Sequence, residues 1–198
     1  MDYLHHSEFK LLETFDRIAV VGPQRSGTKI VANIICAELG YEFVLHYKMP
    51  PNKGGRNKFL NNNNIVLHSP SFFLQTRHLI DTNSAVIFVW RNLEDIQKSI
   101  EKYDARRRIK DYDGLYGIPG KGQAEYKQTK WINMCSKLEK TDFIFNVKYE
   151  DLEGHSLWIG EEHRKAFSDI NQVDMEGNTY TPEGISLWTG ANNGSTES

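Results

Sequence analysis

Short, solidly apolar runs alternate along the chain with longer segments in which apolar residues recur every three or four positions. The runs are typical of buried strands, and the longest of them, "AVIFVW", ends at Trp90. The periodic segments predict helices, and Gly40 follows one of them where a C-terminal cap is expected. The predicted strands are 17–21, 42–45, 65–67, 85–90 and 143–147, and the predicted helices are 30–39, 71–80, 92–103 and 123–138.

Strands that are apolar throughout and alternate with helices predict an α/β fold, a three-layer, mainly parallel β-sheet flanked by helices. The 198 residues fit a single domain, 1–198, with a core at about 17–152 and a loop-rich tail at 171–198. Segments 48–64 and 104–122 have no clear period and are expected to be loops. Ligands of such sheets bind beyond the carboxyl ends of the strands, so functional residues should follow strands.

Composition narrows the classes of partner. The net charge of −2 gives no general electrostatic attraction to nucleic acid or to a membrane surface, and no apolar run is long enough to cross a bilayer. Cys36 and Cys135 lack a metal-like spacing and predict reduced thiols, so a cytoplasmic protein without a disulfide is expected. The basic, tyrosine-rich segment 103–130 is either a lid over an acceptor or a solvated loop with a basic helix. Trp131, Ile132, Met134 and Leu138 are expected on the buried side of their helix.

The loop "GPQRSGTK", residues 22–29, lies between a predicted strand and a predicted helix. Backbone N–H groups at such a turn form an anion site, which Arg25 and Lys29 reinforce with positive charge and Ser26 and Thr28 with hydroxyls. A nucleotide-binding P-loop has Lys followed by Ser or Thr after its last glycine, whereas this loop has Thr28 followed by Lys29. The loop therefore predicts an anion site in which the last two residues stand in the reverse of the usual P-loop order.

The strand 85–90 is followed by a cation, Arg91, where an ATP-dependent P-loop enzyme has the acidic residue that holds Mg²⁺. Arg91 therefore favours direct binding of a second anion and no metal, although a surface arginine would give the same sequence. Ser99 lies about two helical turns further on.

Three stretches, "PQRSGT", "RNLEDIQKS" and "NVKYEDL", resemble motifs of the PAPS-dependent sulfotransferases, and the similarity runs from about residue 17 to residue 152. The resemblance implies a P-loop-like sulfotransferase architecture. It also implies transfer of a sulfuryl group from PAPS to a hydroxyl or amine acceptor by in-line displacement, with PAP as product and no metal.

Carried over by this resemblance, the 5′-phosphosulfate loop comprises Arg25, Ser26, Gly27, Thr28 and Lys29. Arg25 would also be catalytic, because it lies where charge develops on the leaving phosphate. Arg91 and Ser99 would bind the 3′-phosphate in a separate pocket.

His68 is the expected catalytic base, because it follows a strand and is itself followed by Pro70, as in the cytosolic branch of the family. His46 and Glu42 are competing candidates. Two other functions stay open: a P-loop kinase or NTPase, which the Thr28–Lys29 order and Arg91 oppose, and a non-catalytic protein that binds PAP or a nucleotide.

Overall fold

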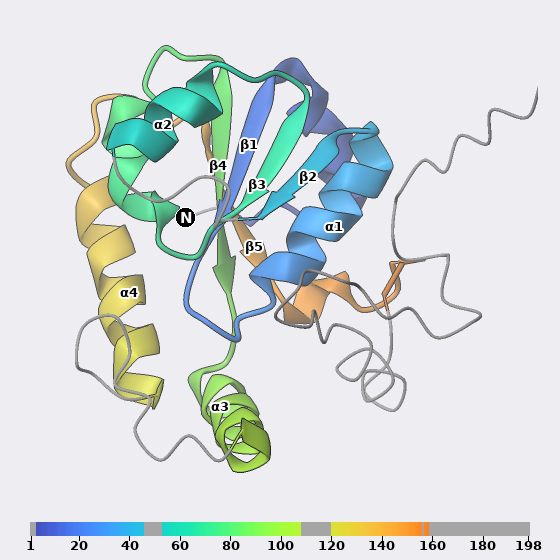
Figure 1. Cartoon of the computed structure of the whole chain (residues 1–198), viewed down its shortest axis with the longest axis vertical. Coiled ribbons are helices and arrows are strands. Elements are labelled where there is room, and N and C mark those ends of the chain that lie inside the picture. The colour runs from blue at the N-terminus through green and yellow to red at the C-terminus, as the bar shows by residue number, and fades with distance from the viewer. Residues whose placement is uncertain (1–2, 46–52, 108–119, 156, 159–198) are drawn as a thin grey trace, which may run out of the picture. The chain divides into compact units, whose positions relative to one another are not determined.

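The computed structural model describes residues 3–45, 53–107, 120–155 and 157–158, and its strands form one five-stranded sheet in the order β2-β3-β1-β4-β5 (Figure 1). All neighbouring strands are parallel. The strands are β1 Arg17–Val21, β2 Glu42–Leu45, β3 Ile65–His68, β4 Ser84–Trp90 and β5 Ile144–Lys148. The predicted α/β class with a parallel sheet is confirmed.

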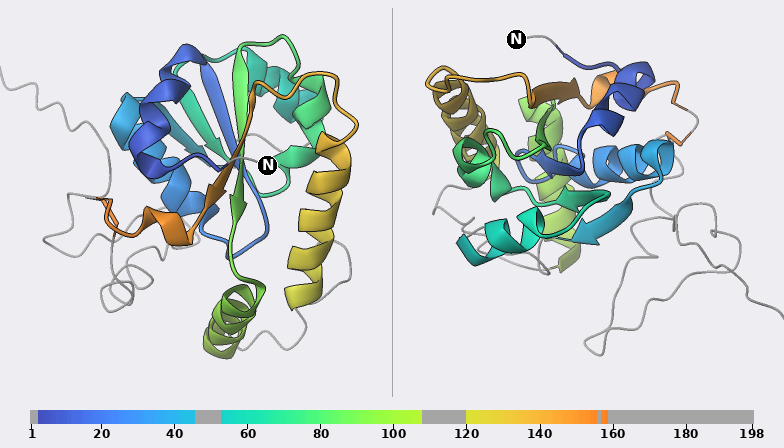
Figure 2. Two further views of the ribbon diagram at one scale, coloured as in Figure 1. Left: turned by 180° about the vertical axis from the view of Figure 1, so that it is seen from behind. Right: turned by 90° about the horizontal axis from the view of Figure 1, so that it is seen from above.

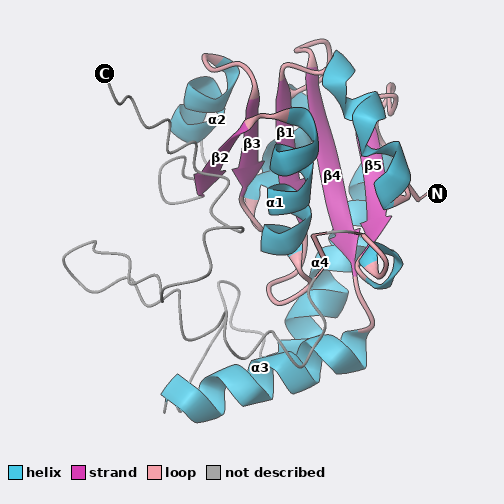
Figure 3. Ribbon diagram, turned by 90° about the vertical axis from the view of Figure 1, so that its right-hand side faces the viewer, coloured by secondary structure: helices cyan, strands magenta, loops and turns pink. Residues whose placement is uncertain are grey.

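Helices cover both faces of the sheet, as Figures 2 and 3 show. On one face α1 packs against β1, β2, β3 and β4. On the other face α4 packs through Trp131, whose ring stacks on Phe88 at 4.7 Å. The α-helices are α1 Thr28–Leu39, α2 Lys53–Leu60, α3 Leu93–Arg107 and α4 Gly120–Cys135. The 3₁₀ helices are η1 His6–Thr14, η3 Phe72–His78 and η4 Glu150–Leu152.

The helix α1 ends where the sequence predicts. Its buried residues Val31, Ile34 and Ile35 follow the 3.6-residue period, so one side of the helix packs on the sheet. Gly40 caps the helix in the left-handed conformation, with φ of 70°, and its N–H donates to the Cys36 carbonyl at 2.8 Å.

Several predicted elements need correction. The expected loop 48–64 contains α2, and the expected helix 71–80 is the shorter 3₁₀ helix η3. The expected loop 104–122 contributes its first residues to α3 and its last to α4, while 108–119 lie outside the described residues. Ile132 is 45% exposed, whereas Trp131 is buried as predicted.

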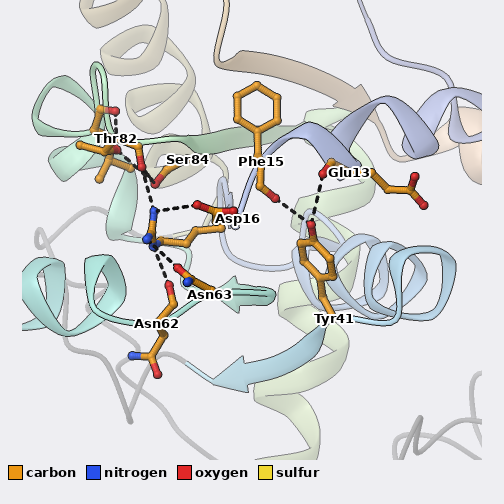
Figure 4. A network of polar contacts seen from close by, with 10 residues as sticks. Glu13, Phe15, Asp16, Tyr41, Asn62, Asn63, Thr82 and Ser84 are labelled. Carbon is orange, nitrogen blue, oxygen red and sulfur yellow. Dashed lines mark hydrogen bonds and ion pairs between the residues drawn. The ribbon is translucent and has the colours of Figure 1, made fainter.

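At the amino ends of the strands, polar contacts hold β1 to the loops that precede β3 and β4 (Figure 4). Arg17, the first residue of β1, donates from Nε to the Asn62 carbonyl at 2.5 Å and from Nη1 to the Thr82 carbonyl at 2.8 Å. Its Nη2 donates to Asn63 Oδ1 at 2.7 Å. Tyr41 adds a hydrogen bond to the Phe15 carbonyl at 2.8 Å. These side-chain hydrogen bonds therefore link β1 and its neighbouring loops at the amino end of the sheet.

The chain divides into two compact units, Met1–Glu153, which holds every strand, and Gly154–Ser198, most of which lies outside the described residues. The expected tail 171–198 belongs to that part, and the single domain stays a prediction. None of the helices in the described ranges has the length and apolar character needed to cross a membrane.

Candidate functional site

The residues predicted to form the site lie at the carboxyl ends of β1, β3 and β4, where the chain crosses from one side of β1 to the other. β1 lies between β3 and β4; the chain leaves β1 to build β2 and β3 on one side and then crosses to β4 on the other. The loops at the carboxyl ends of these strands diverge at that point, which is where parallel sheets bind ligands. The strand β1, the loop 22–27 and the helix α1 follow in the order of a P-loop-like fold.

The loop itself is held by internal contacts and by a close neighbour. The amide and the hydroxyl of Ser26 both donate to the Pro23 carbonyl, at 3.3 and 2.8 Å. Gly27 has φ of 92°, and a Cβ added there would lie 2.1 Å from Cδ2 of the Tyr149 ring. Gly27 is thus required twice, for its backbone conformation and for the space that Tyr149 occupies. Ser26 shapes the loop, and its hydroxyl is already engaged.

The helix α1 begins at Thr28, directly after this loop. The first amides of an α-helix have no intrahelical acceptor, and the helix dipole is positive at that end. Thr28 and Lys29 carry such amides, so the loop and the helix together present the donors that the predicted anion site requires. Burial lowers the pKa of the Lys29 ammonium group, because its charged form is partly removed from water.

The end of β3 contributes His68. Its Nε2 lies 2.9 Å from the Thr28 hydroxyl, within hydrogen-bonding distance. Its ring stacks on Phe43 of β2 at 6.3 Å, with 17° between the planes. These two contacts fix the imidazole beside the first turn of α1. The predicted base is therefore adjacent to the predicted anion loop.

The end of β4 contributes Arg91. Its Nη1 donates to the Arg25 carbonyl at 2.9 Å, and its guanidinium lies 4.3 Å from the centre of the Tyr149 ring. The Arg91 Nε is buried and makes no hydrogen bond within the described part of the chain. Arg25, which has φ of 67°, donates from Nε to Ser99 Oγ on α3 at 3.1 Å. Arg91 therefore contacts the loop, and Arg25 links the loop to α3.

The structure brings most of the predicted site residues into one connected set. Arg25 contacts both Arg91 and Ser99, so the two anion pockets expected to be separate are joined. Glu42 opens β2 and pairs with Ile65 at the amino edge of the sheet, so its candidacy as a base is wrong. His46 lies outside the described residues.

The sequence interpretation missed Tyr149 as a site residue. Its ring covers Gly27 and stacks under Arg91. The signal was present, because Tyr149 follows β5 directly and belongs to one of the three motif-like stretches. In the described ranges no three His, Cys, Asp or Glu side chains gather as a metal site requires. The expectation that the site needs no metal stays a prediction.

Comparisons with known proteins give a limited result. No family model matches the chain, and no curated protein matches it. Among solved structures it is similar to a gluconokinase from Sinorhizobium meliloti 1021, with 14% identity over 69% of this chain and 83% of that chain and a TM-score of 0.38. It is also similar to shikimate kinase from Acinetobacter baumannii in complex with shikimate, with 18% identity over 66% of this chain and 99% of that chain and a TM-score of 0.36.

These findings correct the predicted function. The expected transfer of a sulfuryl group from PAPS is contradicted, because the two similar structures are kinases and no family model supports a sulfotransferase. The motif-like stretches do lie around one loop, but that arrangement is shared by anion sites of many kinds. At this level of similarity the two kinases say nothing about the substrate of this chain.

Proposed function

We propose that this chain binds the phosphate groups of a nucleoside triphosphate at the loop 22–28 and transfers its terminal phosphoryl group, as a P-loop kinase or NTPase does. One observation carries the proposal. The Arg91 guanidinium contacts the loop that precedes α1, and His68 Nε2 lies 2.9 Å from the Thr28 hydroxyl in the first turn of that helix.

Each group has a role that its chemistry supports. The amides of Thr28 and Lys29 would bind phosphate oxygens, and the Arg91 guanidinium would donate two parallel hydrogen bonds to a phosphate group. The terminal phosphoryl group would then pass to an acceptor oxygen as its bond to the bridging oxygen breaks, and the nucleoside diphosphate would leave. Fixed cations such as Arg25 would stabilise charge on that leaving group. His68 would take the proton of the acceptor hydroxyl or water.

The residues at the strand ends do not fit a magnesium site of the usual kind. Phosphotransferases with a P-loop hold Mg²⁺ through a hydroxyl after the loop lysine and through an acidic residue at a strand end. Here Lys29 is followed by Ile30, and the ends of β3 and β4 carry His68 and Arg91. We therefore assign no step to a metal.

The same observation favours a second candidate, a protein that binds a nucleotide without turning it over. Arg91 at the end of β4 suits binding of the nucleotide phosphates, whereas the missing acidic residue removes one usual part of the catalytic machinery. The two candidates share the anion site and differ in the chemical step.

Thermal unfolding with ATP, with ATP and Mg²⁺, and with PAP tests the shared part. A nucleotide at a hundred times its dissociation constant stabilises the protein by about 2.7 kcal/mol. We expect ATP or ADP to give such a shift and Arg91→Ala to weaken binding by about tenfold or more. The exposed Arg77 offers a charge-matched control, and Arg77→Ala should leave the shift unchanged.

Turnover then separates the two candidates. Release of ADP that is lost in His68→Ala, with nucleotide affinity retained, supports the phosphotransferase. Stable binding of ATP without release of ADP supports the binding protein. The proposal is overturned if neither ATP nor ADP binds, with or without Mg²⁺, or if PAP binds at least ten times more tightly than both.

A further inference from the structure

Lys127 on α4 is fully buried, which is exceptional for a lysine. Its Nζ is enclosed and has no hydrogen-bond partner among the described residues. The neighbouring Lys130, one turn later, is exposed and lies over the Tyr126 ring. Lys127 takes no part in the phosphate site assigned above. Its burial therefore calls for a separate explanation.

The position of Lys127 follows from the packing of α4. Four residues later, Trp131 stacks on Phe88 of β4 and donates from Nε1 to Asn146 Oδ1 at 3.0 Å. Residues four apart share one helix face, so Lys127 also faces the sheet. The helix α4 runs back toward the start of β5, antiparallel to the strands, and its first residues lie beside α3 (Figure 1). Lys127 is therefore nearer than Trp131 to the carboxyl ends of the strands.

Ser69 places a second polar group on this side of the sheet. Ile65 and Leu67 of β3 belong to the core cluster that contains Trp131, and side chains alternate along a strand. Ser69 continues the alternation, because its amide donates to the Val20 carbonyl at 3.1 Å and extends the pairing of β3 with β1. Its Oγ is buried, and no partner for it occurs in the described ranges. His68, the intervening residue, faces Thr28 on the α1 side.

Two buried donors thus lie on the α4 side of the sheet, at the end where the phosphate loop begins. An ammonium group without a partner in apolar surroundings is unfavourable. An anion with several oxygens would supply acceptors to an ammonium and a hydroxyl that face it. We propose that Lys127 Nζ and Ser69 Oγ converge on one anion subsite, distinct from the loop 22–28, that binds a carboxylate or phosphate group of the second substrate. Only the identification with the second substrate rests on the proposed function.

The subsite has a signature that a structural lysine lacks. Burial lowers the pKa of Lys127 to about 8, so about half of the molecules carry the charge at pH 8. An anion beside the ammonium raises that pKa, and the protein then takes up protons as it binds. Calorimetry in two buffers of different ionisation enthalpy measures this uptake.

The experiment titrates inorganic phosphate, and separately acetate, into protein that carries Arg91→Ala to weaken the loop site. We expect an uptake of up to about half a proton per anion at pH 8. Adding Lys127→Met should abolish the uptake and weaken the anion at least tenfold, whereas Lys130→Met should change neither. Ser69→Ala should weaken the anion severalfold with the uptake retained, which provides a test if Lys127→Met does not fold. The stronger of the two anions identifies the group.

The proposal is overturned if Lys127→Met leaves affinity and proton uptake as in the parent protein, or if the parent binds neither anion. Failure of the proposed function has a different signature. In that case ATP and ADP fail to bind the unmodified chain, while the Lys127-dependent uptake with phosphate or acetate remains.

Discussion

Among single residues, Gly27 decides whether the phosphate loop can form. Its φ of 92° is a conformation that side chains with a Cβ rarely adopt, and the Tyr149 ring already occupies the space of that Cβ. Tyr149 in turn supports Arg91. A change at Gly27 therefore disturbs the loop, the ring and the cation together.

Gly27→Ala should lower the free energy of unfolding by about 2–4 kcal/mol, because backbone strain and a clash add. Gly40→Ala is the matched control: Gly40 also has positive φ, of 70°, but open space around its Cβ position. It should lose only about 1 kcal/mol. Urea unfolding of both variants measures the difference. Equal losses would show that Tyr149 does not confine Gly27.

Lys127 should also make stability depend on pH in a predictable direction. Its pKa falls from an ordinary 10.5 to about 8 in the folded protein. Well below pH 8 both the folded and the unfolded states are protonated, and the full cost of burying the charge is present. Between pH 8 and 10.5 the unfolded chain binds more protons, so stability rises with pH, and above that range the cost is gone.

In a buffer without small anions that Lys127 could bind, wild-type stability should therefore rise relative to Lys127→Met between pH 7 and 10, by about 2–3 kcal/mol in total. The Cys36 thiol, whose pKa burial raises to about 12, acts in the opposite direction but is the same in both proteins. Urea unfolding at several pH values measures the difference. A constant difference would mean that Lys127 keeps its ordinary pKa.

At the scale of secondary-structure elements, the sequence predicts the strands but does not predict the helix α2. A strand buried on both faces is apolar along its whole length, as in β4, and such a run needs no neighbour to be recognised. The helix α2 contains two glycines and buries only Gly55 and Phe59, so neither its propensity nor its period identifies it. Its helical form depends on packing that the local sequence does not encode.

The site divides in the same way. The rule that ligands bind beyond the carboxyl ends of parallel strands led to the loop 22–28, His68 and Arg91, and the structure brings these residues together there, while their function stays a prediction. The contact between Arg25 and Ser99 could not be predicted, because it depends on how α3 packs. Lys127 could not be predicted either, since lysine is the last residue type expected in a core.

The amino end of the sheet offers a test of element packing. Arg17 makes hydrogen bonds to two carbonyls and one side chain from the loops before β3 and β4, and its side chain is 13% exposed. Arg17→Met should lower the free energy of unfolding by about 2–4 kcal/mol, because three acceptors lose a charged donor. Nucleotide affinity should not change, since the site is at the other end. The exposed Lys10, replaced in Lys10→Met, is the control for loss of a charge.

At the scale of the whole molecule, the strand order explains why distant segments meet. With β1 between β3 and β4, His68 and Arg91 reach the segment 22–28 from opposite sides of β1, although long stretches of chain separate them from it. The described contacts of this site, and the residues of the proposed subsite, lie within the unit Met1–Glu153.

A chain that ends at Glu153 should consequently fold and keep the site. We expect its thermal midpoint to stay within a few degrees of the full chain, because the sheet and the helices on both faces are intact. ATP or ADP should bind within about threefold of its affinity for the full chain, a difference under 1 kcal/mol. Calorimetry and thermal unfolding of both proteins measure this. Loss of nucleotide binding in a folded, shortened chain would show that residues after 153 contribute to the site, and loss of folding would show that the sheet alone does not complete the core.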